Sequence, residues 1–354
     1  MAVTCQPFGK LANGQAVEQW ILTDDRLRAC VLTYGAALQS LCFDGVEVAL
    51  GFDTIEDYQA ARCPYIGMIV GRYANRLPRE LEVSGKTYAL ACNEGDAVQL
   101  HGGEDGLHRR LWKAEAAPGP YPGVTLTTCC AHMQAGCPGE MTIRVTYTLR
   151  PGPALGIDYE ATCDQDTVVN LTNHAFFNLN GVGKEDIRNH RVKLCASRYL
   201  PVDSQLLPLG EPCPVEGTPF DFMAEDTDET SSIGSRLGCE HPQIALAGGI
   251  DHNFCIDGEG LRLAARVSSP VTGIAVECIS DQPGLQIYVG QGLNEAAGAG
   301  GHPIGLFGGF CLETQHYPDS PRHPEYPTTF LPAGEMFRSH TEYRFFQQER
   351  GEKK

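Results

Sequence analysis

The stretch Met141-Thr-Ile-Arg-Val-Thr-Tyr-Thr-Leu-Arg150 alternates apolar and polar side chains along its whole length. After the turn sequence Pro151-Gly-Pro153, the alternation returns in Leu155-Gly-Ile-Asp-Tyr-Glu160. A period of two places successive apolar side chains on one face of a β-strand, and two such runs joined by a Pro/Gly turn are typical of an antiparallel hairpin. The stretch therefore predicts an all-β, antiparallel protein in which one face of this hairpin meets water.

The next stretch, Val168-Val-Asn-Leu-Thr-Asn-His-Ala-Phe-Phe-Asn-Leu-Asn-Gly181, predicts a third strand beside the hairpin, so that the three form a meander. Its apolar face carries Val169 and Leu171. Its other face is polar and carries Asn170, Thr172 and His174. Buried polar groups without partners are costly, so we expect water or a polar ligand on that side. His174 is a functional candidate, and a structural histidine is the alternative.

Further strand-like segments occupy the rest of the chain. A capping-box sequence, Asp53-Thr-Ile-Glu56, predicts a short helix, and Ser84-Gly85 predicts a hairpin turn. An apolar strand with a polar end is expected over Pro64–Arg76, and a strand pair is expected around Asp281–Gly284. Additional strands are expected at Trp20–Thr23, Arg28–Tyr34, Leu38–Phe43 and Phe310–Gln315.

Charge and cysteine content restrict the function classes. The formal net charge of the 354 residues is −17, which disfavours nucleic acid and anionic membrane surfaces as partners. The 15 cysteines have no regular spacing, so we expect unpaired buried thiols in a reducing compartment rather than a disulfide framework. Neither a signal peptide nor a run of membrane-spanning length is recognisable. We therefore expect a cytoplasmic, soluble protein.

Four polar residues have both a functional and a structural interpretation. His101 precedes two glycines, and local sequence alone favours an exposed loop histidine. Arg72 and Arg76, near the end of an expected strand, are candidates for binding a substrate or for plain surface charge. Asp251 follows a glycine pair and either caps a turn or faces a site.

Glu313 stands out because it lies in the apolar strand Phe310-Cys-Leu-Glu-Thr-Gln315. Phe310 and Leu312 share one face, whereas Glu313 and Gln315 share the other. A carboxylate is disfavoured in a core, so Glu313 either reaches water or takes part in chemistry.

Common catalytic motifs are not recognisable in the sequence. We find no P-loop, dinucleotide fingerprint, Gly-x-Ser-x-Gly elbow or HExxH helix. The cysteines and histidine of Cys129–Cys137 do not have the spacing of a zinc site, so we expect no metal there.

Seven short motifs, taken together in their order along the chain, resemble the aldose 1-epimerase (galactose mutarotase) family over nearly the whole length. They are Leu50-Gly-Phe-Asp53, Gly71-Arg-Tyr-Ala-Asn-Arg76, Leu100-His-Gly-Gly103, Asn170-Leu-Thr-Asn-His174 with Phe177-Asn-Leu179, Asp251-His-Asn-Phe254, Pro283-Gly-Leu-Gln286, and Leu312-Glu-Thr-Gln315 with Pro318-Asp-Ser-Pro321.

The resemblance implies a single domain over residues 1–354, folded as a large antiparallel β-sandwich with a few short helices. It also implies interconversion of the α and β anomers of a free aldohexose such as galactose or glucose, without cofactor or metal. His174 would be the general acid and Glu313 the general base. The substrate-binding residues would be Asn75, Arg76, His101, Asp251 and Gln286. The chain would be a monomer or a homodimer.

The chemistry of mutarotation requires these residue types. A base must remove the proton of the anomeric hydroxyl while an acid protonates the ring oxygen, so that the ring opens to an aldehyde. We expect mutual attraction to keep Glu313 ionised and His174 protonated. Donors such as His101 would stabilise developing charge, while Arg76 and Asp251 suit vicinal hydroxyls.

Two departures from the family pattern leave the sugar preference open. Ala175-Phe176 replaces the frequent Ser-Tyr after the histidine, and Gln291-Gly-Leu-Asn294 replaces an Asn-Phe-Leu-Asp run. The Gly/Ala-rich loop that follows, Glu295–Gly301, has a composition that predicts flexibility.

Two other functions remain as alternatives. A hexose-6-phosphate 1-epimerase would need a basic pocket, for which Arg109-Arg110 is the candidate pair, and a non-catalytic sugar-binding module would not need both the acid and the base.

Overall fold

The alternating hairpin forms as the sequence predicts. In the computed structural model, which describes residues 1–224 and 229–348, β13 (Met141–Arg150) pairs antiparallel with β14 (Ala154–Cys163). Every second residue of β13 is buried, including Ile143, Val145 and Tyr147. The period of two therefore places one face of the hairpin in the core and leaves the other partly open to solvent.

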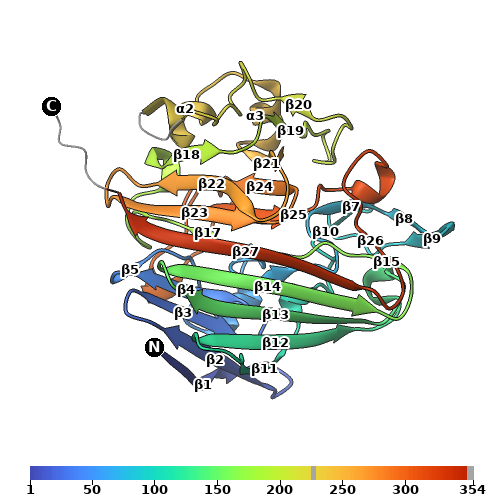
Figure 1. Ribbon diagram of the computed structural model, residues 1–354, viewed down its shortest axis with the longest axis horizontal. Helices are drawn as coiled ribbons and strands as arrows, with labels where there is room; N and C mark the ends of the chain where they lie inside the picture. Colours follow the sequence, from blue (N-terminus) through green and yellow to red (C-terminus); the bar gives the residue numbers. More distant parts are fainter. Residues whose placement is uncertain (225–228, 349–354) are drawn as a thin grey trace.

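Antiparallel strands build three large sheets, which confirms the all-β prediction (Figure 1). The eight-stranded sheet has the order β11 (Lys113–Ala116), β12 (Gly123–Cys130), β13, β14, β27 (Met336–Gln347), β23 (Ile274–Ser280), β22 (Arg262–Ser268), β18 (Arg191–Leu194). The six-stranded sheet has the order β17 (Phe176–Phe177), β25 (Phe310–Gln315), β24 (Gly284–Tyr288), β21 (Asp251–Cys255), β19 (Arg198–Tyr199), β20 (Cys213–Pro214). The five-stranded sheet contains β1 (Ala2–Lys10), β2 (Ala16–Thr23), β3 (Leu27–Leu32), β4 (Leu38–Phe43) and β5 (Val46–Glu47).

Four two-stranded pairs and three short α-helices complete the described residues. The pairs are β6 (Ile69–Val70) with β16 (Thr172–Asn173), β7 (Arg76–Pro78) with β10 (Val98–Leu100), β8 (Glu80–Val83) with β9 (Lys86–Ala89), and β15 (Thr167–Val168) with β26 (Phe330–Leu331). The helices are α1 (Ile55–Ala60), α2 (Ile233–Leu237) and α3 (Pro242–Ala247). The predicted turn at Ser84-Gly85 joins β8 to β9, and both residues have positive φ.

The predicted first helix forms, but its cap differs by one residue. Thr54, rather than Asp53, is the N-cap, and its hydroxyl accepts a hydrogen bond from the backbone N–H of Asp57. The prediction of one strand over Pro64–Arg76 was wrong. Gly67 and Gly71, with φ of 76° and 153°, interrupt it, and only β6 and the start of β7 are extended.

The predicted meander was also wrong, because long-range pairing replaces it. The strand next to β14 is β27, from the C-terminal end of the chain (Figure 1). The pair expected around Asp281–Gly284 does not form either, since β23 belongs to the eight-stranded sheet and β24 to the six-stranded one. Local periodicity identifies strands but does not specify partners distant in sequence.

The segment Val168–Gly181 crosses between sheets instead of forming one strand. Its short extended pieces pair with β26, β6 and β25 in turn. The face expected to be wet is dry, because Asn170 and Thr172 are both 0% exposed. The Asn170 side chain donates to the carbonyls of Ala74 and His316 and accepts from the N–H of His316. The Asn170 amide is thus satisfied by protein groups, whereas the Thr172 hydroxyl has no hydrogen-bond partner among the described residues.

All 15 cysteines are free, as the irregular spacing predicts, although only seven of them are buried. In the described part of the chain, no helix is both long enough and apolar enough to span a membrane.

Buried histidines predict a loss of stability in acid. Burial lowers the pKa of His190 to about 3 and that of His252 to about 4. Between those values and the ordinary pKa of 6.5, the unfolded chain binds a proton at each position that the folded chain does not. The free energy of unfolding should therefore fall as pH falls from 6.5 toward 4, by roughly 1.4 kcal/mol per pH unit for each histidine. Urea unfolding at several pH values measures this slope.

The variant His190→Gln should make the slope shallower by the share of one histidine, whereas His132→Asn, which changes an exposed histidine, should leave it unchanged. A slope equal in His190→Gln and the parent protein would contradict the assignment.

Candidate active site

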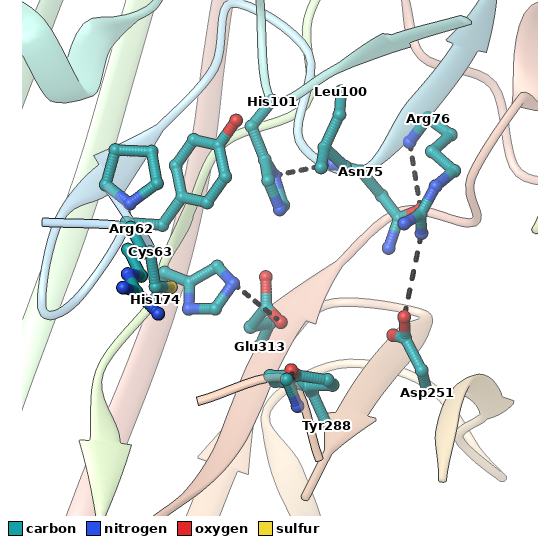
Figure 2. Close-up of a pocket in the computed structure, with 13 residues that line it drawn as sticks. Arg62, Cys63, Asn75, Arg76, Leu100, His101, His174, Asp251, Tyr288 and Glu313 are labelled. Carbon is teal, nitrogen blue, oxygen red and sulfur yellow. Dashed lines mark hydrogen bonds and ion pairs between the residues drawn. The ribbon is translucent and has the colours of Figure 1, made fainter. Parts of the chain in front are cut away.

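A pocket of about 230 Å³ opens above the six-stranded sheet and gathers most of the predicted residues (Figure 2). It is lined by Arg62, Cys63, Pro64, Tyr65, Asn75, Arg76, Leu100, His101, His174, Asp251, Tyr288, Gly292 and Glu313. These residues come from segments that are distant in sequence. The long-range strand pairing is what brings them together.

Strand register aligns one side of the pocket. Directly paired residues in antiparallel strands project from the same face. One row across β21, β24 and β25 contains Asp251, Tyr288 and Cys311, and the next contains Asn253, Gln286 and Glu313. The sheet itself therefore sets the spacing between these side chains.

His101 and Asn75 hold each other in place. The backbone N–H of His101 donates to the Asn75 carbonyl, and the Asn75 N–H donates to His101 Nδ1 at 3.0 Å. Both residues have positive φ, 53° and 63°, which is uncommon outside glycine. The exposed-loop interpretation of His101 was wrong, since only 4% of the residue is exposed.

The hydrogen bond from Asn75 also decides the chemistry of the His101 ring. Because Nδ1 accepts a hydrogen bond, the neutral ring carries its hydrogen on Nε2. Burial lowers the His101 pKa well below its ordinary value, helped by His174 and Arg76, so the ring is neutral near pH 7. His101 is therefore a fixed donor.

His174 lies within the crossing segment Val168–Gly181, between β16 and β17. Its backbone N–H donates to the Met68 carbonyl, and its own carbonyl accepts from the Gly67 N–H. The ring of Tyr65 stacks on it at 5.8 Å, and the Phe176 ring lies 5.0 Å away. His174 is 5% exposed, and burial lowers its pKa to about 4.

Glu313 faces His174. Figure 2 shows the two side chains pointing toward each other, with 3.7 Å between His174 Nε2 and Glu313 Oε1. Glu313 is 2% exposed, and among the described residues its Oε2 has no hydrogen-bond partner. Burial, with a smaller contribution from Asp251, raises the Glu313 pKa well above its ordinary value.

These pKa directions correct the expected charge state. In the empty pocket, burial outweighs mutual attraction and favours the neutral forms of both groups over the ion pair. The neutral forms and the ion pair carry the same number of protons and differ only in whether Glu313 or His174 holds the exchangeable one.

Arg76 occupies the other side of the pocket between two carboxylates. Its Nε and Nη2 donate to both oxygens of Glu94, at 2.6 and 3.0 Å, while Nη1 lies 3.8 Å from Asp251 Oδ2. Burial alone would lower the Arg76 pKa, but Asp251 and Glu94 together raise it. The Glu94 contact fixes one edge of the guanidinium and directs the other edge into the pocket.

Six of the seven predicted site residues line the pocket: Asn75, Arg76, His101, His174, Asp251 and Glu313. The seventh, Gln286, does not line the pocket, but it projects from the same face and donates to Asp251 Oδ1 at 2.6 Å. The other candidate arginine, Arg72, is structural, because its side chain donates to the Pro138 and Gly139 carbonyls.

The sequence analysis missed Tyr65, Tyr288 and Glu94. Tyr65 and Tyr288 belong to apolar segments that look like ordinary core, and Glu94 lies in a loop. Only the tertiary structure places them beside the site.

The chemistry of the donor set does not fit a metal ion at this place. His101, His174 and Glu313 offer atoms within 4.8 Å of one another. A metal-binding nitrogen must present a lone pair, yet Asn75 occupies His101 Nδ1 and leaves a hydrogen on Nε2. The Cys129–Cys137 segment contributes nothing to this group of residues.

Comparison with known proteins identifies the family. The aldose 1-epimerase family model matches residues 18–344. The chain is 36% identical to rat galactose mutarotase over 354 residues, covering 98% of this chain and 99% of that one. This chain belongs to the aldose 1-epimerase family. It is an epimerase, an enzyme of the isomerase class, and its substrate is a small-molecule sugar.

Other family members agree with this assignment. Human galactose mutarotase is 36% identical over 97% of this chain and 98% of its own, and aldose 1-epimerase of Escherichia coli K12 is 34% identical over 84% and 85%. The crystal structure of galactose 1-epimerase from Lactobacillus acidophilus superposes with a TM-score of 0.87 at 27% identity, covering 99% of this chain and all of that one.

The loop that departs from the family pattern is attached to the pocket of this epimerase. Glu295 accepts hydrogen bonds from the backbone N–H groups of Arg62 and Cys63, and it is 7% exposed. Glu295, at the start of this loop, therefore helps to hold the rim of the pocket.

Removing the carboxylate beside Arg76 should weaken sugar binding. In Glu94→Gln, the guanidinium loses its charge-assisted clamp, and Arg76 can turn toward Asp251. We expect KM to rise about tenfold, with a smaller change in kcat, because a binding contact is affected rather than the chemistry. Steady-state polarimetry measures both constants.

Glu82→Gln is the matched control, since Glu82 is exposed on β8. If KM were the same in Glu94→Gln as in the parent enzyme, the clamp would have no role in binding.

Proposed function

We propose that this epimerase interconverts the α and β anomers of a free aldohexose, with galactose and glucose as its first candidate substrates. The observation that supports this most directly is the facing pair His174 and Glu313, 3.7 Å apart within a pocket of about 230 Å³. The names of the related mutarotases point to galactose.

Each ring opening or closure of the hemiacetal moves two protons, one at the anomeric hydroxyl and one at the ring oxygen. Glu313 takes the proton of the anomeric hydroxyl, and His174 gives a proton to the ring oxygen, so that the bond from C1 to the ring oxygen breaks and an aldehyde forms. After rotation about C1–C2, the reverse transfers close the ring to the other anomer. Both protons are restored, and no oxidation takes place.

Substrate binding must set the charge state that this sequence needs. In the empty pocket, burial favours neutral Glu313 and neutral His174. Sugar hydroxyls that donate to Glu313, together with Arg76, stabilise the carboxylate and so favour the form in which Glu313 is ionised and His174 carries hydrogens on both ring nitrogens. The acid and base are thus prepared by the substrate.

The remaining polar residues have complementary roles. His101 presents its fixed Nε2–H as a donor, and Arg76 presents the guanidinium edge that Glu94 leaves free. Asp251 accepts from hydroxyls, while Gln286 holds one of its oxygens. Asn75 accepts from the Arg76 N–H through its side-chain oxygen and keeps its amide N–H groups for the sugar.

The two alternatives have less support. A phosphate site at Arg109-Arg110 lacks a structural basis, because Arg109 pairs with Glu104 and Arg110 donates to Gln134, and neither lines the pocket. A non-catalytic sugar-binding module would not require a buried acid and base at facing distance.

Polarimetry tests the proposal. Freshly dissolved α-D-galactose and α-D-glucose should relax faster to the same final rotation when the protein is present. Glu313→Gln and His174→Asn should each lower kcat/KM by at least about 100-fold, because each loses one proton-transfer group.

His132→Asn, an exposed change, should retain full activity. Absence of acceleration with either sugar by the folded parent protein would refute the free-hexose proposal, and hexose phosphates would be the next substrates to test.

The pH profile of kcat/KM follows from the pair. Below the His174 pKa of about 4, both groups are protonated and the base is lost; above the raised Glu313 pKa, both are deprotonated and the acid is lost. The enzyme should therefore keep its activity from neutral pH down to near pH 5. Brief assays, corrected for spontaneous mutarotation, measure the profile. An acid limb near pH 6.5 would show that His174 titrates as an exposed histidine.

A further inference from the structure

The thiol of Cys311 is buried beside the catalytic pair, on the same strand as Glu313 and next to the His174 ring. Cys311 lies in β25, two residues before Glu313 and on the same face, and it is 0% exposed. Its Sγ lies 3.4 Å from His174 Nδ1, within hydrogen-bonding distance for sulfur. One strand thus provides both the carboxylate that faces Nε2 and a thiol that faces Nδ1.

Ring packing orients the His174 plane but does not distinguish its two edges. Tyr65 stacks on the ring, Phe176 lies against it, and the His101 ring meets it edge-on at 5.2 Å. Each of these contacts would survive a half-turn of the imidazole about its bond to Cβ. That half-turn would replace Nδ1 and Nε2 by carbon atoms and so remove the proton-transfer atom from Glu313.

We propose that Cys311 is a positioning residue for His174: its thiol hydrogen-bonds to Nδ1 and so keeps Nε2 directed at Glu313 and at the sugar. The catalytic meaning of this inference rests on the proposed function, whereas the hydrogen bond itself does not.

The protonated thiol can supply the hydrogen of this bond. Burial, together with the nearby Glu313, raises the pKa of Cys311 well above its ordinary value, so the sulfur keeps its hydrogen. In the proposed arrangement the thiol donates to Nδ1 of the neutral His174 ring, which then carries its own hydrogen on Nε2. When His174 takes up the second proton, Nδ1–H can donate to the sulfur, because a thiol is both a weak donor and a weak acceptor. The contact can persist through both proton transfers.

Nitrogen-15 NMR of histidine-labelled protein tests the hydrogen bond without reference to activity. His174→Asn assigns the signal, and the parent protein should show the Nε2–H tautomer for His174 at pH 7. Cys311→Ala should move the His174 nitrogen shifts toward a mixture of tautomers, while Cys311→Ser, which keeps a donor and acceptor, should restore the parent pattern. The other histidine signals report whether each variant is folded.

Kinetics test the positioning role. Cys311→Ala should lower kcat about tenfold while changing KM much less, and Cys311→Ser should recover most of the lost rate. Cys278→Ala is the matched control, because Cys278 is also 0% exposed but belongs to β23 of the eight-stranded sheet. It should change neither the His174 signal nor kcat.

Three results would overturn the proposal: an unchanged His174 tautomer in Cys311→Ala, an equal loss of rate in the Ser and Ala variants, or the same loss in Cys278→Ala. If the parent protein lacked epimerase activity, the proposed function would fail separately. The tautomer in Cys311→Ala would still decide the hydrogen bond, a shift supporting it and an unchanged signal refuting it.

Discussion

The side-chain amide of Asn170 is the contact on which the rest of the site depends. It joins Ala74 and His316 to the crossing segment, and the backbone of Asn170 also pairs with Arg72 and Ala74. The three joined segments continue directly into Asn75 and Arg76, into His174, and back into the strand of Glu313. An unsatisfied buried amide would cost roughly 1–3 kcal/mol per group, so this arrangement is strongly favoured over its alternatives. The positions of the pocket residues are therefore fixed by hydrogen bonds in the protein core.

Burial has a second effect at the site, through electrostatics. It shifts His174 and Glu313 toward their neutral forms, and it keeps His101 neutral as a donor. Burial alone would lower the pKa of Arg76, but the two carboxylates beside it raise it. A dry pocket of this kind strengthens every hydrogen bond that a sugar makes in it, and it leaves one mobile proton rather than a fixed ion pair.

Alternation in the sequence was sufficient for several of the strands, and the family motifs were sufficient for most of the site. Alternation identified β13 and β14, and the motif residues Asn75, Arg76, His101, His174, Asp251 and Glu313 do meet in one pocket. The failures share a physical cause. The neighbour of β14, the dry polar face of Asn170 and the burial of His101 all depend on partners more than 25 residues away, which periodicity cannot specify. Cys311 was missed for the same reason, since its partner His174 is 137 residues away. Glu94 was missed because it lies in a loop, although its partner Arg76 is only 18 residues away.

The strand register described for Asp251, Gln286 and Glu313 has a consequence for how this protein can vary during evolution. Because the pleat of a sheet repeats every two residues, loss of one residue inside β24 would turn Gln286 and Tyr288 to the opposite face. Insertions in the loops outside the strands leave that alternation intact. The chain can therefore accept changes in loop length and rim sequence, with altered substrate preference, while its reacting groups are inherited unchanged.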